Sequence, residues 1–331
     1  RWTMYYEEYR RRPKRRRRRR DRRPAGGCLT ALLLRLLALI VVLAALAAGL
    51  LYALPPSLFS VEPDDSRLSL TDGLPANRVN ILLLGTDLLR QSSQRSDSIL
   101  IASVGYDSLK LTSVLRDTLV EIPGHGRGKL NAAYAYGGPE LVMRALNENF
   151  RLNIMHYIAA DFVSLVRIVD AIGGVDIDIT DAERTQINAN VLSVRKAFRP
   201  LGYTAAELVQ SGDATHLTGL QALGYARIRK IDSDFKRTYR QRTLLNAMLG
   251  KIRSNLWNPV MLYRLGKAIL QSTRTNMSPV QLISLGEKAL VAGRAQQLRL
   301  PVDGSFTDNG SSLKITDWQA NIGEFQSFVY H

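Results

Sequence analysis

Cysteine is nearly absent from this 331-residue sequence, in which Cys28 is the only one. An intrachain disulfide is therefore impossible, and no zinc site can be built from cysteine thiolates. The four histidines also lack the spacing of metal ligands: His125, His156, His216 and His331. These absences exclude a disulfide-stabilised scaffold and a cysteine-based zinc protein.

Two common catalytic motifs are missing as well. The glycine-rich stretch at 124–129 lacks the G-x-x-x-x-G-K-[ST] register of a Walker loop, and Leu130 follows its lysine. No G-x-S-x-G nucleophile elbow occurs, and no internal repeat is visible. The sequence therefore gives no support for a P-loop nucleotide-binding protein or for a serine hydrolase with a nucleophile elbow.

Positive charge is concentrated at the start of the chain. The formal net charge is +16, and residues 1–23 hold 13 lysines and arginines against three acids. We expect residues 1–27 to be a disordered basic tail that attracts anionic lipid. Such a tail is also typical of nucleic-acid binding. Because this tail has no interleaved recognition fold, we predict no nucleic-acid partner.

A long uncharged run follows the basic tail. Residues 36–54 carry no charge, which matches the roughly 20 residues that cross a bilayer. A cleaved signal peptide is the alternative, but its apolar region is usually about 7–15 residues long, and Pro55 and Pro56 stand here instead of a cleavage site. We predict a transmembrane helix at 28–54. The basic tail then lies in the cytoplasm and the rest outside, in a single-pass protein of the cell membrane.

The remainder reads as a linker at 55–75 and one domain at 76–331. Short apolar runs predict strands at 78–85, 98–104, 109–115, 154–160, 175–179 and 298–302. Helical patterns occur at 131–136, 139–150, 161–172, 217–225, 241–254, 261–271 and 279–292, and 180–215 predicts loops and short helices. This mixture predicts an α/β fold, a three-layer α/β/α sandwich with a mixed central sheet, preceded by one transmembrane helix.

Arginines and aspartates recur near the ends of the predicted strands. Arginine forks match phosphate oxygens, and paired carboxylates hold a hard divalent cation. A site with both arginines and carboxylates suggests a metal-bridged pyrophosphate. The predicted transmembrane helix suggests that this pyrophosphate belongs to a lipid. Simpler roles stay open: an aspartate can cap a turn, and Arg237 and Arg240 can pair with Asp232, Asp234 or Glu183. The residues concerned are Asp87, Arg95, Asp97, Arg116, Asp117, Lys129, Arg227, Arg229, Arg237 and Gln241.

Taken in order, these motifs resemble the LytR-CpsA-Psr family of cell-wall glycopolymer ligases. The resemblance covers roughly residues 78–255. It rests on Ile81-Leu82-Leu83-Leu84-Gly85-Thr86-Asp87, Arg95-Ser96-Asp97-Ser98, Leu115-Arg116-Asp117-Thr118, Lys129-Leu130-Asn131, Ile172-Gly173-Gly174-Val175, Tyr225-Ala226-Arg227-Ile228-Arg229 and Arg237-Thr238-Tyr239-Arg240-Gln241.

The resemblance implies a phosphotransferase that moves a glycopolymer from a polyprenyl-pyrophosphate carrier to a peptidoglycan hydroxyl through a phosphodiester bond. It implies that Asp87 and Asp97 hold Mg²⁺ (or Mn²⁺). The pyrophosphate would be bound by Arg95, Arg116, Lys129, Arg227, Arg229, Arg237 and Gln241. Arg116, Asp117, Arg227 and Arg229 would be catalytic, with Asp117 as the candidate base. The prenyl tail would lie between the sheet and the helices at 139–150 and 161–172, which ordinary core packing explains equally well.

Three other functions stay open at this point. A polyprenyl-pyrophosphate binding protein would hold the carrier without turnover, and a pyrophosphatase would use water in place of the sugar acceptor. A DNA-binding regulator would act through the basic tail. The sequence leaves the glycopolymer, the acceptor hydroxyl and the oligomeric state open.

Overall fold

The computed structural model describes residues 65–86, 96–204, 206, 210–229, 231 and 234–331. They lie within one compact unit that runs from Pro56 to His331. The predicted tail and transmembrane helix, and two predicted site residues, Asp87 and Arg95, lie outside the described residues. Within the described part, no helix combines the length and the hydrophobicity needed to cross a membrane.

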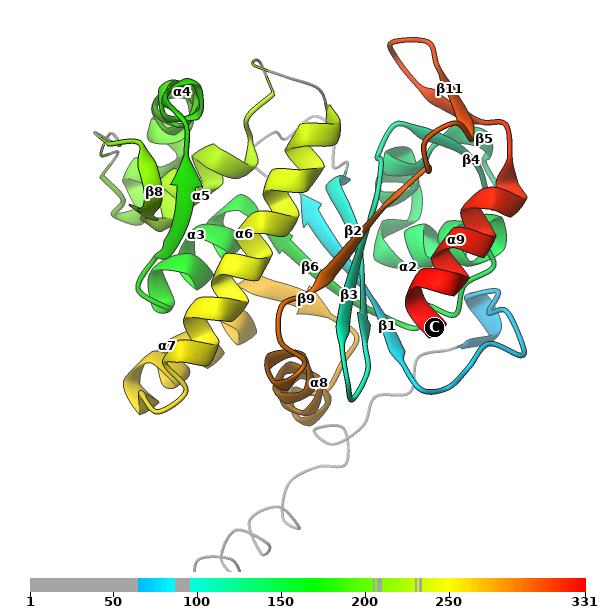
Figure 1. Cartoon of the computed structure of the whole chain (residues 1–331), viewed down its shortest axis with the longest axis horizontal. Helices are drawn as coiled ribbons and strands as arrows, with labels where there is room; N and C mark the ends of the chain where they lie inside the picture. Colours follow the sequence, from blue (N-terminus) through cyan, green and yellow to red (C-terminus); the bar gives the residue numbers. More distant parts are fainter. Residues whose placement is uncertain (1–64, 87–95, 205, 207–209, 230, 232–233) are drawn as a thin grey trace, which may run out of the picture. The chain divides into compact units, whose positions relative to one another are not determined.

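The domain is an α/β fold built on a mixed sheet of six strands (Figure 1). Across the sheet the order is β10 (Gln296–Leu300), β3 (Leu109–Val114), β2 (Ser96–Val104), β1 (Val79–Thr86), β6 (His156–Asp161) and β9 (Thr273–Thr275). β1 is antiparallel to β2 and parallel to β6, and β10 is parallel to β3. The predicted α/β class with a mixed sheet is therefore confirmed.

Helices cover both faces of this sheet. On one face lie α2 (Leu130–Phe150) and α9 (Trp318–Tyr330), and on the other α6 (Asp234–Ser254) and α8 (Pro279–Val291). Neighbouring residues of a strand point to opposite faces, so Leu82 packs with α2 while Ile81 packs on the side of α6 and α8. This alternation explains why the apolar run of β1 is buried on both sides.

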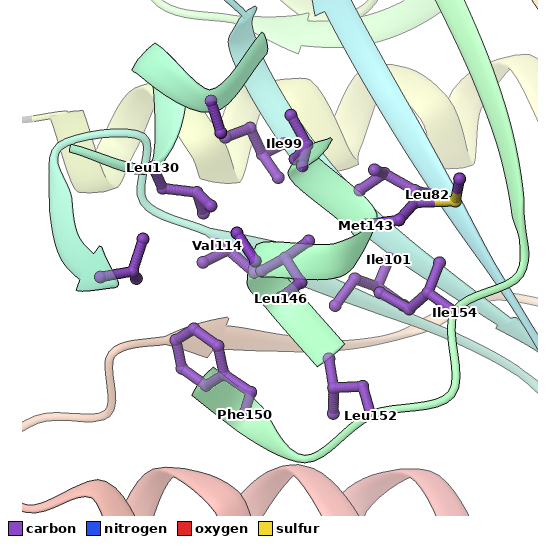
Figure 2. Close-up of a cluster of buried hydrophobic side chains, with 14 of the residues drawn as sticks. Leu82, Ile99, Ile101, Val114, Leu130, Met143, Leu146, Phe150, Leu152 and Ile154 are labelled. Atoms are coloured by element: carbon purple, nitrogen blue, oxygen red, sulfur yellow. The ribbon is translucent and has the colours of Figure 1, made fainter. Parts of the chain in front are cut away.

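The larger core lies between the sheet and α2 (Figure 2). Met143, Leu146 and Phe150 of α2 are fully buried against strand residues such as Leu82 and Ile101. Full burial of side chains of this size stabilises a fold by about 1.5–3 kcal/mol each. The second half of α2 therefore serves the core, which is the simpler of the two roles predicted for it.

The predicted break in this helical region is confirmed within α2. Gly137 and Gly138 have non-helical backbone angles, and Gly138 has a φ of 64°. This left-handed conformation favours glycine, because a side chain there is strained. The kink separates Leu130–Tyr136, where Asn131 N–H binds the carbonyl of Arg116, from the core-packing half that begins at Pro139.

A helical region with its own cores lies beside the main sheet. It contains α3 (Phe162–Ala171), β7 (Val175–Ile179), α4 (Asp181–Phe198), η3 (Arg199–Leu201), β8 (Gly212–Leu217), α5 (Gly219–Ala226) and α7 (Pro259–Ser272). Asp161 caps α3 by accepting a hydrogen bond from the backbone N–H of Ser164. A second sheet is formed by strands that come after β3 and after β10 in the chain. Its order is β11 (Phe306–Asp308), β12 (Leu313–Ile315), β4 (Thr118–Ile122) and β5 (Gly126–Lys129). A short η2 (Asp65–Arg67) precedes β1.

One predicted loop region and one predicted helix boundary are wrong. The stretch assigned to loops and short helices contains α4, which is 18 residues long. Its signals were present, since Thr180 and Glu183 form a capping box and Ile187, Val191 and Val194 recur on one buried face. α6 begins at Asp234 rather than at Gln241, because tertiary contacts bury polar residues of its first two turns.

Candidate active site

The predicted site lies where several strand ends meet. β1 ends at Thr86, which pairs with Ser96 at the start of β2 and with Asp161 at the end of β6. β3 ends at the same edge of the sheet, because it runs antiparallel to β2. Loops that leave one sheet edge commonly carry functional residues. Residues from four separate segments are thus brought to one edge.

A β-bulge places Asp97 at this edge. Gly85 pairs with Ser98 but Thr86 pairs with Ser96, which leaves Asp97 as the extra residue of β2. Bulges re-aim side chains and often occur beside active sites. Glycine fits at position 85 because an added Cβ would come within 3.0 Å of the Ser98 Cβ. Asp97 was predicted to precede the strand and instead lies inside it.

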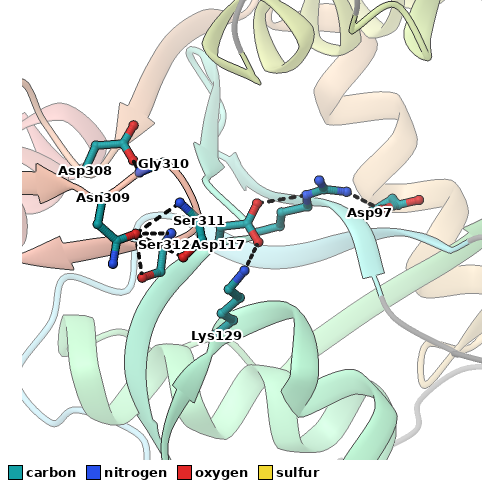
Figure 3. A network of polar contacts seen from close by, with 9 residues as sticks. Asp97, Asp117, Lys129, Asp308, Asn309, Gly310, Ser311 and Ser312 are labelled. Carbon is teal, nitrogen blue, oxygen red and sulfur yellow. Dashed lines mark hydrogen bonds and ion pairs between the residues drawn. The ribbon is translucent and has the colours of Figure 1, made fainter.

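Asp97 binds two arginines that are distant in the sequence. Its Oδ1 lies 2.6 Å from Nη1 of Arg116 and 3.3 Å from Nη2 of Arg229. Arg116 also donates from Nε to Oδ2 of Asp117 at 3.2 Å. Lys129 Nζ reaches Oδ1 of the same Asp117, also at 3.2 Å. We call these five residues the charged cluster, and Figure 3 shows four of its side chains in one line of contacts.

Backbone contacts hold the loop after β3 in place. Leu115 N–H binds the carbonyl of Leu300, and Asn131 N–H binds the carbonyl of Arg116. The carbonyl of Asp117 accepts from Leu313 N–H on β12. The loop is therefore fixed by the central sheet, by α2 and by the second sheet, which leaves the side chain of Arg116 to face Asp97.

Arg227 lies beside the cluster on another element. It follows the end of α5, and its guanidinium carbon lies 4.9 Å from the ring centre of Phe162. Such a cation–π contact helps to orient a guanidinium. Phe162 begins α3 directly after Asp161, the partner of Thr86, so Arg227 is tied to the same sheet edge.

α6 contributes two more predicted residues. Gln241 accepts a hydrogen bond at its Oε1 from Ser98 Oγ at 2.9 Å, one residue from Asp97. Arg237, one turn earlier on the same helix face, is buried with 2% exposure. Arg240 instead pairs with Glu183 of α4 at 2.8 Å, which is the structural role that the sequence left open for it.

Burial shifts the pKa of several groups near this edge. Burial against the sheet, with Arg299 nearby, lowers the pKa of Arg242 to about 10. Its guanidinium donates to Ser113 of β3 and to Gln297 of β10, so it joins α6 to the sheet. Burial also raises the pKa of Tyr134 on α2 above its usual range, so its hydroxyl keeps its proton.

Two cavities, each of about 240 Å³, open beside the edge. The first is lined by residues of β1, α2, β6, α3, α7 and β9, including Thr86, Tyr134, Asp161, Arg167 and Arg274. The second borders Arg116, Asp117 and Phe235, and the β11–β12 turn with Ser311 and Ser312 closes it. Sequence reasoning missed this turn, because nothing in residues 306–315 signals that they reach the loop after β3.

Of the two predicted metal ligands, the structure describes Asp97. Among the described residues, no group of three or more histidines, cysteines or acids is arranged to hold a metal ion. Asp87 and Arg95 lie outside those residues, although Asp87 directly follows Thr86 in the chain. Both arginines contact Oδ1 of Asp97, so Oδ2 is the oxygen that a cation would take. A carboxylate oxygen is the donor that Mg²⁺ prefers, and the position fits such an ion.

The sequence matches one protein family over most of its length. The profile of the LytR_cpsA_psr family covers residues 61–325. The chain belongs to the LytR-CpsA-Psr family. The resemblance identified from the ordered motifs is therefore confirmed, and the charged cluster lies within the matched region.

Members of the LytR-CpsA-Psr family with curated names are similar in sequence. The polyisoprenyl-teichoic acid–peptidoglycan teichoic acid transferase TagU of Bacillus mycoides is 31% identical over 242 residues, which are 70% of this chain and 71% of TagU. The regulatory protein MsrR of Staphylococcus aureus is 29% identical over 250 residues, 72% of this chain and 70% of MsrR.

Solved LytR-CpsA-Psr structures share the fold. TagT bound to LI-WTA superposes with a TM-score of 0.61 at 24% identity, covering 81% of this chain and 95% of TagT. TagT with bound octaprenyl pyrophosphate lipid gives a TM-score of 0.57 at 21% identity, covering 82% and 97% of the two chains. At these identities the likeness establishes the fold.

Proposed function

We propose that this chain is a phosphotransferase that moves a glycopolymer from a polyprenyl-pyrophosphate carrier to a peptidoglycan hydroxyl. The observation that carries the proposal is the contact of Arg116 and Arg229 with Asp97 at the sheet edge. It gathers guanidinium groups beside a carboxylate that suits a cation, as pyrophosphate binding needs. Family membership and the name of the TagU relative supply the reaction and the acceptor.

The cluster suits a phosphoryl transfer in which the protein mainly positions and neutralises charge. The acceptor hydroxyl oxygen forms a bond to the phosphorus that carries the glycan. The bond from that phosphorus to the bridging oxygen breaks, and polyprenyl monophosphate leaves. Arg116, Arg227, Arg229 and Arg237 bind the phosphate oxygens as negative charge develops on the leaving group. Lys129, Gln241 and Arg95 support this binding.

The proton of the acceptor hydroxyl needs a base. Asp117 borders the second cavity and is oriented by Arg116 and Lys129. A hydroxyl that enters this cavity meets the carboxylate beside the pyrophosphate-binding arginine. We therefore assign Asp117 as the base and the second cavity as the place of the acceptor.

Asp87 and Asp97 would hold the metal ion in this proposal. When bound, Mg²⁺ or Mn²⁺ would neutralise pyrophosphate oxygens and support the departure of the lipid phosphate. The protein itself holds Asp97 in the bulge, where its Oδ1 orders two arginines.

The organisation of the chain supports an enzyme on the outer face of the cell membrane. We propose a cytoplasmic tail at 1–27, a transmembrane helix at 28–54, a linker at 55–75 and a catalytic domain at 76–331. The sheet with helices on both faces is then a three-layer α/β/α catalytic core. The lipid-linked glycan and the peptidoglycan acceptor are its partners.

The test uses the full chain in lipid vesicles, with a polyprenyl-pyrophosphoryl oligosaccharide, peptidoglycan fragments and Mg²⁺. Phosphate-linked sugar on the peptidoglycan is the readout. We expect Arg116→Ala to lower transfer about 10²–10³-fold. Arg195→Ala, at an exposed position of α4, should leave it unchanged and is the matched control.

Other results would replace the proposal with a named alternative. Tight carrier binding by the wild-type chain with no product would indicate a polyprenyl-pyrophosphate binding protein. Polyprenyl monophosphate released without any acceptor product would indicate a pyrophosphatase. Equal transfer by Arg116→Ala and the wild-type chain would contradict the assigned site.

A further inference from the structure

Exposed apolar side chains are concentrated on one part of the domain. Nine of the fifteen large hydrophobic residues that are exposed in the described part lie between Leu256 and Val291. We define the α7–α8 surface by five of them: Trp257, Val260, Tyr263, Ile283 and Val291, which are 97%, 56%, 71%, 71% and 75% exposed. Scattered apolar residues are ordinary on a protein surface, but a group of this size marks an interaction site.

A contact between elements brings the turn before α7 close to the end of α8. Arg253, at the end of α6, donates to the carbonyls of Leu290 (2.6 Å) and Gly293 (2.7 Å) at the end of α8. The turn that bears Trp257 therefore lies beside the end of α8. In Figure 1, α7, α8 and the β2–β3 turn lie along the lower edge of the domain.

The β2–β3 turn adds a further aromatic residue to this side. Lys288 of α8 places its Nζ 4.6 Å from the ring centre of Tyr106, which is 80% exposed. The aromatic residues Trp257, Tyr263 and Tyr106 thus accompany the aliphatic ones. Tryptophan and tyrosine are the residues enriched where proteins meet the headgroup level of a bilayer.

The charge of this region is mainly positive, and the exposed Asp107 of the β2–β3 turn is paired with Arg78. Residues 251–302 contain eight lysines and arginines and a single acid, Glu287. Arg264 and Lys267 lie on the exposed side of α7, next to Tyr263. A second copy of the chain would bring the same positive charge to the contact and be repelled. A surface of anionic lipid phosphates complements both the charge and the apolar side chains.

We propose that the α7–α8 surface docks on the outer face of an anionic membrane. Trp257 and Tyr263 enter the headgroup layer, and Arg264 and Lys267 bind lipid phosphates. This docking goes beyond the proposed transfer and does not depend on it, because it uses none of the charged cluster.

The docking would also orient the active site. Val79, the first residue of β1, pairs with Val104 beside the β2–β3 turn, whereas Thr86 at the other end borders the charged cluster. Eight residues of strand span about 25 Å. The cluster is therefore held at the far end of β1 from the bilayer, on the side from which peptidoglycan would approach.

The test measures the depth of single labelled positions in the full chain, reconstituted in vesicles. On a Cys28→Ser background, Trp257→Cys and Tyr263→Cys carry an environment-sensitive fluorophore, and Leu192→Cys on α4 is the control at an exposed apolar site. In phosphatidylglycerol vesicles we expect a blue shift and quenching by nitroxide lipids at 257 and 263, and neither at 192. In phosphatidylcholine both signals should weaken.

A charge variant tests the electrostatic part. Arg264→Gln with Lys267→Gln should lower the ratio of docked to undocked label roughly tenfold or more. Arg195→Gln with Lys196→Gln on α4 removes the same charge elsewhere and should change nothing. Equal water exposure at 257 and 192 in both lipids would overturn the proposal. So would shielding at 257 that follows protein density but not lipid charge, which would indicate a second copy as the occupant.

Discussion

Oδ1 of Asp97 accepts hydrogen bonds from Arg116 and Arg229, two arginines that reach it from the loop after β3 and the segment after α5. One carboxylate thus fixes the positions of two guanidinium groups before any ligand binds. With Asp117 and Lys129, the cluster carries a net charge of +1 near neutral pH. A pyrophosphate therefore needs further positive charge, which the proposed cation and Arg237 would supply.

Asp97→Asn separates the charge of this residue from its geometry. Asparagine keeps an acceptor at Oδ1 but removes the negative charge that suits a metal ion. We expect transfer to fall about 10²-fold and its response to added Mg²⁺ to flatten. Mg²⁺ titrations of carrier binding and of transfer would measure both. Asp213→Asn, at an exposed position of β8, is the control, and an unchanged Mg²⁺ response in Asp97→Asn would remove Asp97 from the metal site.

Arg116→Lys tests the need for a guanidinium fork. Arg116 contacts Asp97 through Nη1 and Asp117 through Nε, and one ammonium group does not reproduce both directions. We expect about a tenfold or greater loss of transfer despite the retained charge. Lys129→Arg should be tolerated far better, because Lys129 meets Asp117 through a single contact. Steady-state rates for the two variants would show whether geometry or charge matters at each position.

Gly219→Ala should destabilise the fold. An added Cβ would lie 2.4 Å from the carbonyl oxygen of Val166 and 2.9 Å from the carboxylate of Asp170, where α5 packs closely on α3. Overpacking of this kind costs about 1–3 kcal/mol, which a urea unfolding curve would resolve. Gly250→Ala is the matched control, since nothing lies within 4 Å of its Cβ in α6. That change should stabilise the protein by up to about 1 kcal/mol.

The Arg240–Glu183 pair should act on stability rather than on chemistry. The pair is nearly buried, with side chains 7% and 13% exposed, and Glu183 also accepts from the backbone N–H of Thr180 at the start of α4. Arg240→Ala leaves a largely buried carboxylate without this partner and should cost about 1–3 kcal/mol. A double-mutant cycle with Glu183→Gln should give a coupling energy above about 1 kcal/mol. Additive effects would show that the two side chains do not interact.

Asp176 should contribute to stability only above acidic pH. Hydrogen bonds from His216 and then from Lys251 lower the pKa of its carboxyl group. A carboxylate whose pKa is lowered on folding stabilises the fold above its unfolded pKa, about 3.9, and loses this contribution as the pH falls through the folded value. Because the group is 42% exposed, the effect should stay below about 1 kcal/mol.

The measurement compares urea midpoints of the wild-type chain and Asp176→Asn at pH 6 and pH 3. The variant should be slightly less stable at pH 6, and the difference should shrink toward pH 3. A difference that grows as the pH falls would contradict the assigned pKa direction.

The strands were easier to predict than the contacts between them. The apolar run that ends at Gly85 predicted β1, and the glycine pair at 137–138 predicted the kink of α2. The bulge at Asp97 could not be predicted, because it depends on how β2 pairs with β1 rather than on either sequence alone. The first two turns of α6 were missed for a similar reason, since Arg237 and Arg240 are buried only by neighbouring elements.

The sequence by itself determined the α/β class, the family and the residue types of the candidate site, because apolar periodicity and the order of motifs are local properties of the chain. Only the tertiary structure decided which charges meet. Asp97 pairs with Arg116 and Arg229 whereas Arg240 pairs with Glu183, and these partners lie 19, 132 and 57 residues apart. Electrostatic contacts depend on distance in space and on burial, and the packing of the sheet against α6 and α5 sets both.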